Sequence, residues 1–175
     1  GTGKTTTLYN IVKSCNKRVL YLAFNKELCD SAISKFKDLQ RDNVCISTIH
    51  ALALQHVPKT IGKLGIRQIS EMYEISWKEA KSIRTILNQF FSSSAKTLDT
   101  DSEYALDYWE KIQNGEVNCP HDGYLKLFQL SEKKLPYDVL LVDESQDITP
   151  AISSIIAYQK HCTRYLVGDI HQQIY

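Results

Sequence analysis

The sequence predicts an α/β fold in which a parallel sheet carries a phosphate-binding loop. Tyr137–Asp147 reads Y-D-V-L-L-V-D-E-S-Q-D, so four aliphatic residues run directly into two acids. Such a run is typical of a strand that is buried on both faces of a parallel sheet. Gly1–Thr7 reads G-T-G-K-T-T-T, and Gly3-Lys4-Thr5 fits the end of the motif G-x-x-x-x-G-K-[ST]. The two stretches together predict a P-loop NTPase core.

In the phosphate-loop motif, backbone N–H groups surround the phosphates and the Lys side chain reaches the β and γ phosphates. A helix that begins at Lys4 would add the partial positive charge of its N-terminus. The first three motif positions and the strand that should precede them lie before Gly1, so the loop is incomplete, and an ordinary surface turn is the alternative. The nucleotide-binding residues predicted here are Gly1, Thr2, Gly3, Lys4, Thr5 and Thr6.

The first third of the chain alternates helical and strand patterns. Leu8, Ile11, Val12 and Cys15 recur at helical spacing, and the next apolar run is compact enough for a strand. This alternation predicts a parallel sheet with crossover helices. The expected elements are a helix from Lys4 to about Ser14, a strand over Val19–Phe24, a helix from Lys26 to about Gln40, a strand over Val44–Ser47 and a short helix over Thr48–His56.

The stretch from Pro58 to about Leu135 breaks this alternation and predicts a helical insertion. Ser76-Trp77-Lys78-Glu79 is a capping box, and Asn114-Gly115 should end a second helix. We interpret the aromatic residues on the helix faces of this stretch as its core and not as a base-stacking platform. The helix faces predicted to be buried are Ala80, Ile83, Leu87, Phe90 and Phe91, then Ala105, Tyr108, Trp109 and Ile112; Asp122–Leu130 is a third helical candidate.

After the acidic strand, Thr149-Pro150 predicts the start of a helix, and Arg164–Val167 predicts another strand. The domain organisation that follows is a first part of the α/β domain at residues 1–57, a helical insertion at residues 58–135 and a second part at residues 136–175, with the domain truncated at both ends.

Composition predicts a globular protein. The 175 residues are 43% hydrophobic and 23% charged, without a long apolar run or a signal-peptide pattern, so we expect a soluble intracellular protein with no membrane segment. Five cysteines without a C-x-x-C pair argue against a disulfide framework or a zinc site. Residues 1–96 carry 15 Lys/Arg and 7 Asp/Glu, whereas residues 97–175 carry 6 and 13. A basic half suits a polyanion.

Five segments occur in an order that resembles a known family. They are G-T-G-K-T, L-A-F-N-K, T-I-H, L-L-V-D-E-S-Q-D and V-G-D-I-H-Q-Q-I-Y, and they resemble successive motifs in the first RecA-like domain of superfamily 1, UvrD/Rep-like DNA helicases. The stretch H-D-G-Y-L-K-L-F-Q-L-S, with T-P-A-I and H-Q-Q-I-Y, is most similar to the F-box DNA helicase branch. The resemblance implies a RecA-like P-loop NTPase domain with an inserted helical subdomain.

This resemblance implies roles at an ATP and Mg²⁺ site. Lys4 and Thr5 would hold the phosphates and the metal, and Asp143 would hold the metal through its hydration shell. Glu144 would accept a proton from the attacking water, which suits phosphoryl transfer, a reaction that depends on positioning and charge neutralisation. Gln172 would sense the γ-phosphate, because an amide both donates and accepts; a solvated loop residue is the alternative.

The resemblance also implies a path for single-stranded DNA. Aromatic stacking with hydroxyl and cationic phosphate contacts holds single strands without sequence preference. Phe24 could instead fill the strand core, and His50 could merely cap a turn. Gln146 and Asp147 would tie the acidic strand to the neighbouring motifs. The implied DNA-binding residues are Phe24, Asn25, Lys26, Thr48, His50 and Tyr175.

The function expected is the ATP-binding half of a DNA helicase that moves 3′ to 5′ on single strands in repair or recombination, in the nucleus of a eukaryote or the cytoplasm otherwise. The F-box and the second RecA-like domain, which brings an arginine finger, are missing from these residues. We therefore expect this fragment alone to be inactive and poorly soluble, with an unpaired place beside the Val139–Val142 strand. The alternative is a catalytically dead fragment that only binds nucleic acid or a protein partner; protein partners are not predicted.

Overall fold

The computed structural model describes residues 3–39, 41–57 and 60–169. Gly1, Thr2, Gln172 and Tyr175 therefore lie outside the described residues. The chain divides into two compact units, one of residues 1–52, 134–148 and 156–175 and the other of residues 53–133 and 149–155. The domain boundaries expected at 57/58 and 135/136 stay a prediction. Within the described part of the chain, no helix is both long and apolar enough to cross a bilayer.

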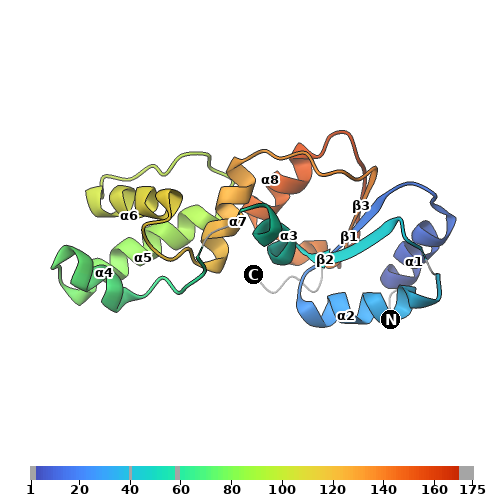
Figure 1. Cartoon of the computed structure of the whole chain (residues 1–175), viewed down its shortest axis with the longest axis horizontal. Coiled ribbons are helices and arrows are strands. Elements are labelled where there is room, and N and C mark those ends of the chain that lie inside the picture. Colours follow the sequence, from blue (N-terminus) through green and yellow to red (C-terminus); the bar gives the residue numbers. More distant parts are fainter. Residues whose placement is uncertain (1–2, 40, 58–59, 170–175) are drawn as a thin grey trace. The chain divides into compact units, whose positions relative to one another are not determined.

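The first unit is built on a parallel sheet (Figure 1), which confirms the predicted α/β class. Its strand order is β2-β1-β3-β4, and every residue of β1 and β3 is buried. The expectation of an unpaired place beside Val139–Val142 is wrong, because β3 pairs with β1 on one side and with β4 on the other. The strands are β1 Val19–Ala23, β2 Val44–Thr48, β3 Val139–Val142 and β4 Thr163–Leu166.

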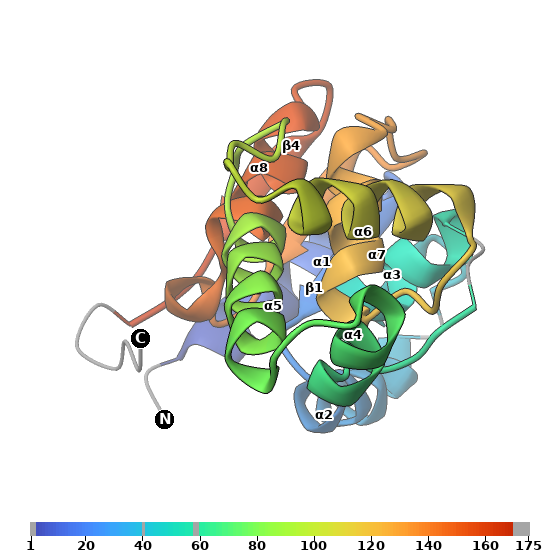
Figure 2. The same ribbon diagram turned by 90° about the vertical axis from the view of Figure 1, so that its left-hand side faces the viewer.

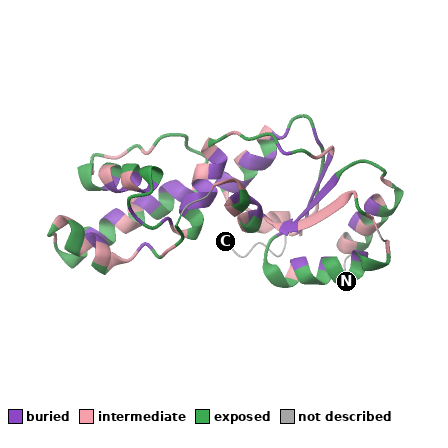
Figure 3. Cartoon of the chain, in the orientation of Figure 1, coloured by how far each residue is buried: buried purple, intermediate pink, exposed green. Residues whose placement is uncertain are grey.

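Two helices cover one face of this sheet. They are α1, Lys4–Ser14, and α2, Lys26–Phe36, which ends in a 3₁₀ turn over Lys37–Leu39. The prediction placed the end of the second helix near residue 40, so it missed the change to a tighter turn. Buried residues are coloured purple on the ribbon of Figure 3. Those of this layer form one core cluster of Leu8, Val12, Val19, Tyr21, Ala23, Cys29, Ala32, Phe36, Val139 and Leu141.

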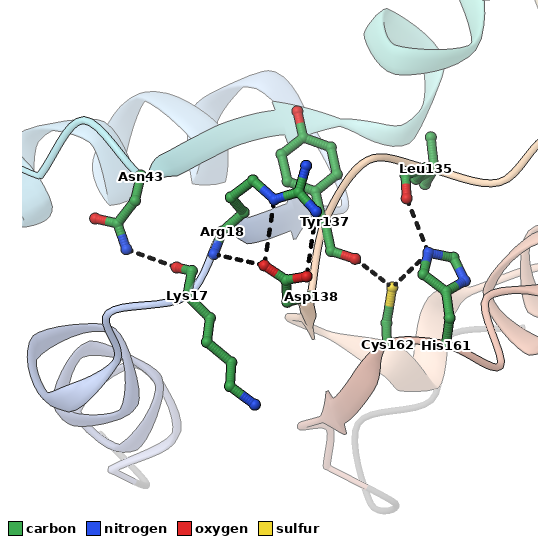
Figure 4. Close-up of polar contacts among 8 residues, drawn as sticks. All are labelled: Lys17, Arg18, Asn43, Leu135, Tyr137, Asp138, His161 and Cys162. Carbon is green, nitrogen blue, oxygen red and sulfur yellow. Dashed lines mark hydrogen bonds and ion pairs between the residues drawn. The ribbon is translucent and has the colours of Figure 1, made fainter.

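Hydrogen bonds join the residues that precede three of the strands (Figure 4). The Arg18 guanidinium donates to both carboxylate oxygens of Asp138 at 3.2 Å, and the Arg18 N–H donates to the same side chain at 3.1 Å. Next to them, Asn43 Nδ2 donates to the carbonyl of Lys17 at 2.6 Å. These contacts join the residues that precede β1, β2 and β3, so they fix the register of the sheet and keep the opposite ends of the strands level.

The second unit is helical (Figure 2). Its helices α5 and α6 bury the faces that the sequence predicted, and α5 begins with the expected capping box. The indole of Trp109 packs against Phe90 and Phe91 with ring centroids 5.4 and 5.6 Å apart, which confirms these aromatics as core. Sequence reasoning missed α4, which buries only Ile69. The helices are α4 Ile66–Tyr73, α5 Trp77–Ser92, α6 Glu103–Asn114 and α7 His121–Leu130; α3, Ile49–His56, and α8, Pro150–Tyr158, include residues of both units.

A buried cation fastens the loop that follows α5. Lys126, on α7, has no exposed surface, and its ammonium lies 4.2 Å from the ring centre of Phe90. It donates to the carbonyls of Ser93 and Ala95 and, at 2.8 Å, to Gln129 Oε1. Burial lowers the pKa of Lys126 to about 8. Nothing in the local sequence indicated this residue, because lysine is almost never fully buried unless it is paired.

Candidate functional site

Most of the predicted site residues that the structure describes lie where strands end. Parallel strands share one carboxyl edge, and in open α/β sheets that edge is where ligands bind. Phe24 follows β1, Thr48 is the last residue of β2, Asp143 follows β3, and Gly168 comes two residues after β4. The register of β1 with both neighbours brings these ends to the same level. We call this region the carboxyl edge.

Asp143 is held at the carboxyl edge by two donors. Asp143 is buried, with only 4% of the residue exposed. The Tyr21 hydroxyl donates to Oδ2 at 2.5 Å, and the N–H of Glu144 donates to Oδ1 at 3.0 Å. Burial, and then the hydrogen bond to Asp143, raises the pKa of Tyr21, so the phenol stays protonated and remains a donor. The orientation of this carboxylate is therefore set before any ligand binds.

The backbone turns sharply at Glu144, where φ is 49° and ψ is 47°. This left-handed conformation is uncommon for a residue other than glycine, and such strain is concentrated at functional sites. The turn leads into the 3₁₀ segment Ser145–Asp147. The amide of Gln146 donates to Glu144 Oε2 at 2.7 Å. An acidic residue that should accept a proton is thus fixed by a short hydrogen bond from its own loop.

Gln146 also connects this loop to the segment after β4. Its Oε1 accepts from the N–H of Asp169 at 3.0 Å. A Cβ built on Gly168 would lie 2.6 Å from Ser145 Oγ and 2.8 Å from Gln146 Oε1, so the two segments approach too closely for a larger residue. For Gln146, these contacts confirm the predicted tie between the acidic strand and a neighbouring motif.

The oxygen donors at this edge fit Mg²⁺. Mg²⁺ prefers oxygen ligands and is usually held by one or two carboxylates together with substrate phosphates. Asp143 supplies such a carboxylate, and Asp147 Oδ1 is buried without a hydrogen-bond partner among the described residues. Among residues 3–39, 41–57 and 60–169, no group of three or more His, Cys, Asp or Glu side chains is placed to hold a metal. A site shared between Asp143, Thr5 and phosphate oxygens agrees with these donors better than an all-protein cage.

The described part of the phosphate loop is ready for an anion. Gly3 is the N-cap of α1 with φ 73° and ψ −3°, a conformation that costs glycine little and other residues more. Among the described residues, no side chain caps the helix and its first turn holds no acidic residue. Apart from the chain neighbours of Gly3, no described atom lies within 4 Å of a Cβ built on it. The first N–H groups of α1 can therefore receive phosphate oxygens. Thr5 is half-buried and Thr6 is exposed; the side chain of Lys4 lies outside the description.

Phe24 lies on the surface. It is 38% exposed, so the alternative in which Phe24 fills the strand core is wrong. The next two residues, Asn25 and Lys26, are exposed as well. An exposed ring followed by a lysine at the carboxyl edge is compatible with stacking on a base and contacting a phosphate.

Two other residues predicted to bind DNA have structural roles. The side chain of Asn25 accepts from the N–H of Leu28 at 2.9 Å and caps α2. Thr48 Oγ1 accepts from the N–H of Ala51 at 3.2 Å and caps α3. His50, on the first turn of α3, is half-buried. The hydroxyl of Thr48 keeps a proton to donate, so capping and phosphate binding are compatible there.

Comparison with known proteins gives a family and two relatives. A family model described as an AAA domain matches residues 1–175. F-box DNA helicase 1 of Gallus gallus is 34% identical over 221 aligned positions, which cover 100% of this chain and 21% of that protein. F-box DNA helicase protein 1 of Schizosaccharomyces pombe is 31% identical over 225 positions, which cover 100% of this chain and 25% of that protein. The chain thus spans a quarter or less of the length of these relatives. Their names confirm the resemblance to F-box DNA helicases that the motifs predicted.

Proposed function

The chain belongs to the AAA domain family, and from this membership we propose that it forms the ATP-binding and ATP-hydrolysing half of a DNA helicase that moves 3′ to 5′ on single-stranded DNA in repair or recombination. The observation that carries the proposal is the pair Asp143 and Glu144, held at the carboxyl edge by Tyr21 and Gln146. The two relatives named as DNA helicases support the choice of substrate.

Asp143 and Glu144 would have different roles in the hydrolysis of ATP. When bound, Mg²⁺ neutralises charge on the phosphates, which together with positioning is most of what phosphoryl transfer requires. Thr5 and Asp143 would hold the metal, and Lys4 and the N–H groups of α1 would hold the phosphates. Glu144 would take the proton of the attacking water, and the amide of Gln146 would keep its carboxylate aimed. Gln172 is proposed to sense the γ-phosphate.

Single-stranded DNA would run across the same edge. Phe24, Asn25 and Lys26 would lie along the path of the strand, with the Phe24 ring stacked on a base. Thr48 and His50 would contact backbone phosphates, and Tyr175 would provide a second stacking position. A second RecA-like domain would complete the nucleotide cleft and bring an arginine, which in other NTPases contributes about 10³–10⁵ in rate. The proposed location is the compartment that holds the DNA, which is the nucleus in a eukaryote.

The experiment compares Asp143→Ala with Glu144→Gln in the full-length protein. We expect Asp143→Ala to weaken Mg²⁺-dependent nucleotide binding, because the metal loses a ligand. Glu144→Gln keeps the shape of the side chain, so it should bind nucleotide normally and hydrolyse it about 10²–10⁴-fold more slowly, the usual contribution of a general base.

Nucleotide titrations and DNA-stimulated ATPase rates decide between the two roles. Equal loss of binding in both variants would refute the division of roles. A wild-type protein that binds single-stranded DNA without binding Mg²⁺ and ATP would instead support the alternative, a catalytically dead module that only binds nucleic acid.

A further inference from the structure

We propose that Tyr21 is a positioning residue for metal-dependent nucleotide binding, acting through its hydroxyl on the carboxylate of Asp143. The inference rests on the proposed function, since it concerns the same metal site. It assigns a chemical role to a side chain that sequence reasoning placed inside an ordinary buried strand.

The sheet geometry places the two side chains on one face. Tyr21 pairs with Leu141 across β1 and β3, and Asp143 follows two residues after Leu141, so it points to the same face. Two residues span about 6.6 Å along a strand, and neighbouring strands lie about 4.8 Å apart. Only a long side chain bridges that diagonal, and the phenol does so with Oη 2.5 Å from Asp143 Oδ2.

The aromatic ring of Tyr21 is held in place by the core. The residue is 1% exposed, and the ring meets Phe36 edge-on with centroids 5.2 Å apart and planes at 90°. Phe36 is held in turn by Tyr9, whose ring lies 5.7 Å away. Because interiors are close-packed, the hydroxyl cannot swing to another partner, and its position is a fixed reference for the carboxylate.

The hydroxyl matters because Asp143 is a buried acid. A carboxylate with 4% exposure must be hydrogen-bonded, since a buried charge without donors is costly. The N–H of Glu144 serves Oδ1, so the Tyr21 hydroxyl is the donor for Oδ2. Carboxylates that hold metals are generally oriented by such donors, and removal of the donor typically reduces metal affinity about 10–100-fold.

The simpler interpretation is that Tyr21 is only a core aromatic, in which case phenylalanine would replace it without consequence for the metal. The two interpretations differ in a measurable ratio, the affinity for nucleotide with Mg²⁺ divided by the affinity without it. A packing defect changes both affinities together, whereas a misplaced ligand changes only the first.

The test uses Tyr21→Phe in the full-length protein, with Tyr9→Phe as the matched control. Tyr9→Phe removes a hydroxyl from the other tyrosine that packs against Phe36, away from any contact with Asp143. A fluorescent ATP analogue is titrated in excess Mg²⁺ and in EDTA. We expect the Mg²⁺ enhancement of affinity to fall about 10-fold or more in Tyr21→Phe, with the EDTA affinity unchanged, and to stay at the wild-type value in Tyr9→Phe.

An unchanged Mg²⁺ enhancement in Tyr21→Phe overturns the inference, and so does an equal fall of both affinities. The ratio is taken within each variant, so a modest loss of stability does not obscure it. In an Asp143→Ala background, Tyr21→Phe should cause no additional loss of enhancement, and an additional loss would show that Tyr21 acts elsewhere. A wild-type protein without any Mg²⁺ enhancement would contradict the proposed function itself, and the inference about Tyr21 would fall with it.

Discussion

Gly168→Ala tests whether the close approach of Gly168 to Ser145 and Gln146 positions Glu144 for hydrolysis. A Cβ at this position would lie 2.6 Å from Ser145 Oγ, 2.8 Å from Gln146 Oε1 and 3.0 Å from the backbone nitrogen of Gln146. The positive-φ glycines of the described chain are Gly3 and Gly115, so the penalty at Gly168 is steric and does not come from the backbone conformation. One of the three neighbours has to move.

The magnitude follows from those contacts. Forcing a methyl group into a packed site typically costs about 1–3 kcal/mol, and loss of the hydrogen bond from Asp169 to Gln146 adds about 0.5–1.5 kcal/mol. Moving Gln146 also moves the amide that donates to Glu144 at 2.7 Å. Since a displacement of about 1 Å can reduce a rate 10²-fold, we expect kcat for ATP to fall by about that factor.

The assay combines denaturant unfolding with the DNA-stimulated ATPase rate at saturating ATP. Gly65→Ala is the control. Among the described residues beyond its chain neighbours, the nearest atom to a Cβ there is Gln68 Cβ at 3.8 Å, and the backbone angles, φ −83° and ψ 130°, are accessible to alanine. Gly65→Ala should leave the rate unchanged and change the stability by no more than about 1 kcal/mol in either direction, because the entropic gain of alanine is opposed by its poor fit at the N-cap of α4. A Gly168→Ala protein with wild-type kcat would refute the idea that this contact positions Glu144.

Three further predictions concern single side chains. Phe24→Ala should weaken single-stranded DNA binding by about 1–3 kcal/mol and leave the urea midpoint near the wild-type value, because the ring is 38% exposed; unfolding of the variant would contradict this. The Lys126 pKa of about 8 lies below the unfolded value of about 10.4, so the unfolded state binds more protons between them. Wild-type stability should therefore rise from pH 8 towards pH 10 relative to Lys126→Met, and parallel urea curves would rule this out. The Arg18 guanidinium lowers the pKa of Asp138, so the stability advantage over Asp138→Asn should be present above about pH 4 and vanish as the pH falls through the lowered pKa. An advantage that persists at pH 2 would show that packing, and not charge, is responsible.

Elements with a local signal could be predicted from the sequence. The run Val139–Val142 can be predicted as a strand because it is short, aliphatic and bounded by Pro136 and two acids, and the Gly1–Thr7 motif favours placing those acids at a nucleotide site. The helix over Trp77–Ser92 was recognised from the Ser76 and Glu79 capping box and from apolar residues at helical spacing. In both cases the chemistry that determines the element lies within a few residues of it.

Features that depend on the tertiary structure could not be predicted in this way. The sequence of one strand does not determine which strands lie beside it. The prediction of an unpaired place beside β3 was therefore wrong, and β4 pairs with β3. The hydrogen bond from Tyr21 to Asp143 joins residues 122 positions apart, and within β1 a tyrosine has the same pattern as any aromatic core residue. Lys126 is similar, since two of its acceptors are backbone carbonyls 31 and 33 positions away, and any residue type can supply a backbone carbonyl.

Two acids that are adjacent in sequence are therefore held by different parts of the fold. Asp143 depends on the core beneath the sheet through Tyr21, whereas Glu144 depends on the segment after β4 through Gln146 and Asp169. A change at Gly168 should thus reduce hydrolysis and leave Mg²⁺-dependent binding intact, and Tyr21→Phe should reduce that binding with a smaller effect on the rate at saturating Mg²⁺ and ATP. The two supports share no side chain and are linked by the N–H of Glu144, which donates to Asp143 Oδ1 at 3.0 Å. If neither change disturbs that backbone hydrogen bond, the combined variant should show the sum of the two single effects within about 0.5 kcal/mol. Coupling larger than that would mean that the two acids move as one unit, and the separation of binding from hydrolysis would have to be abandoned.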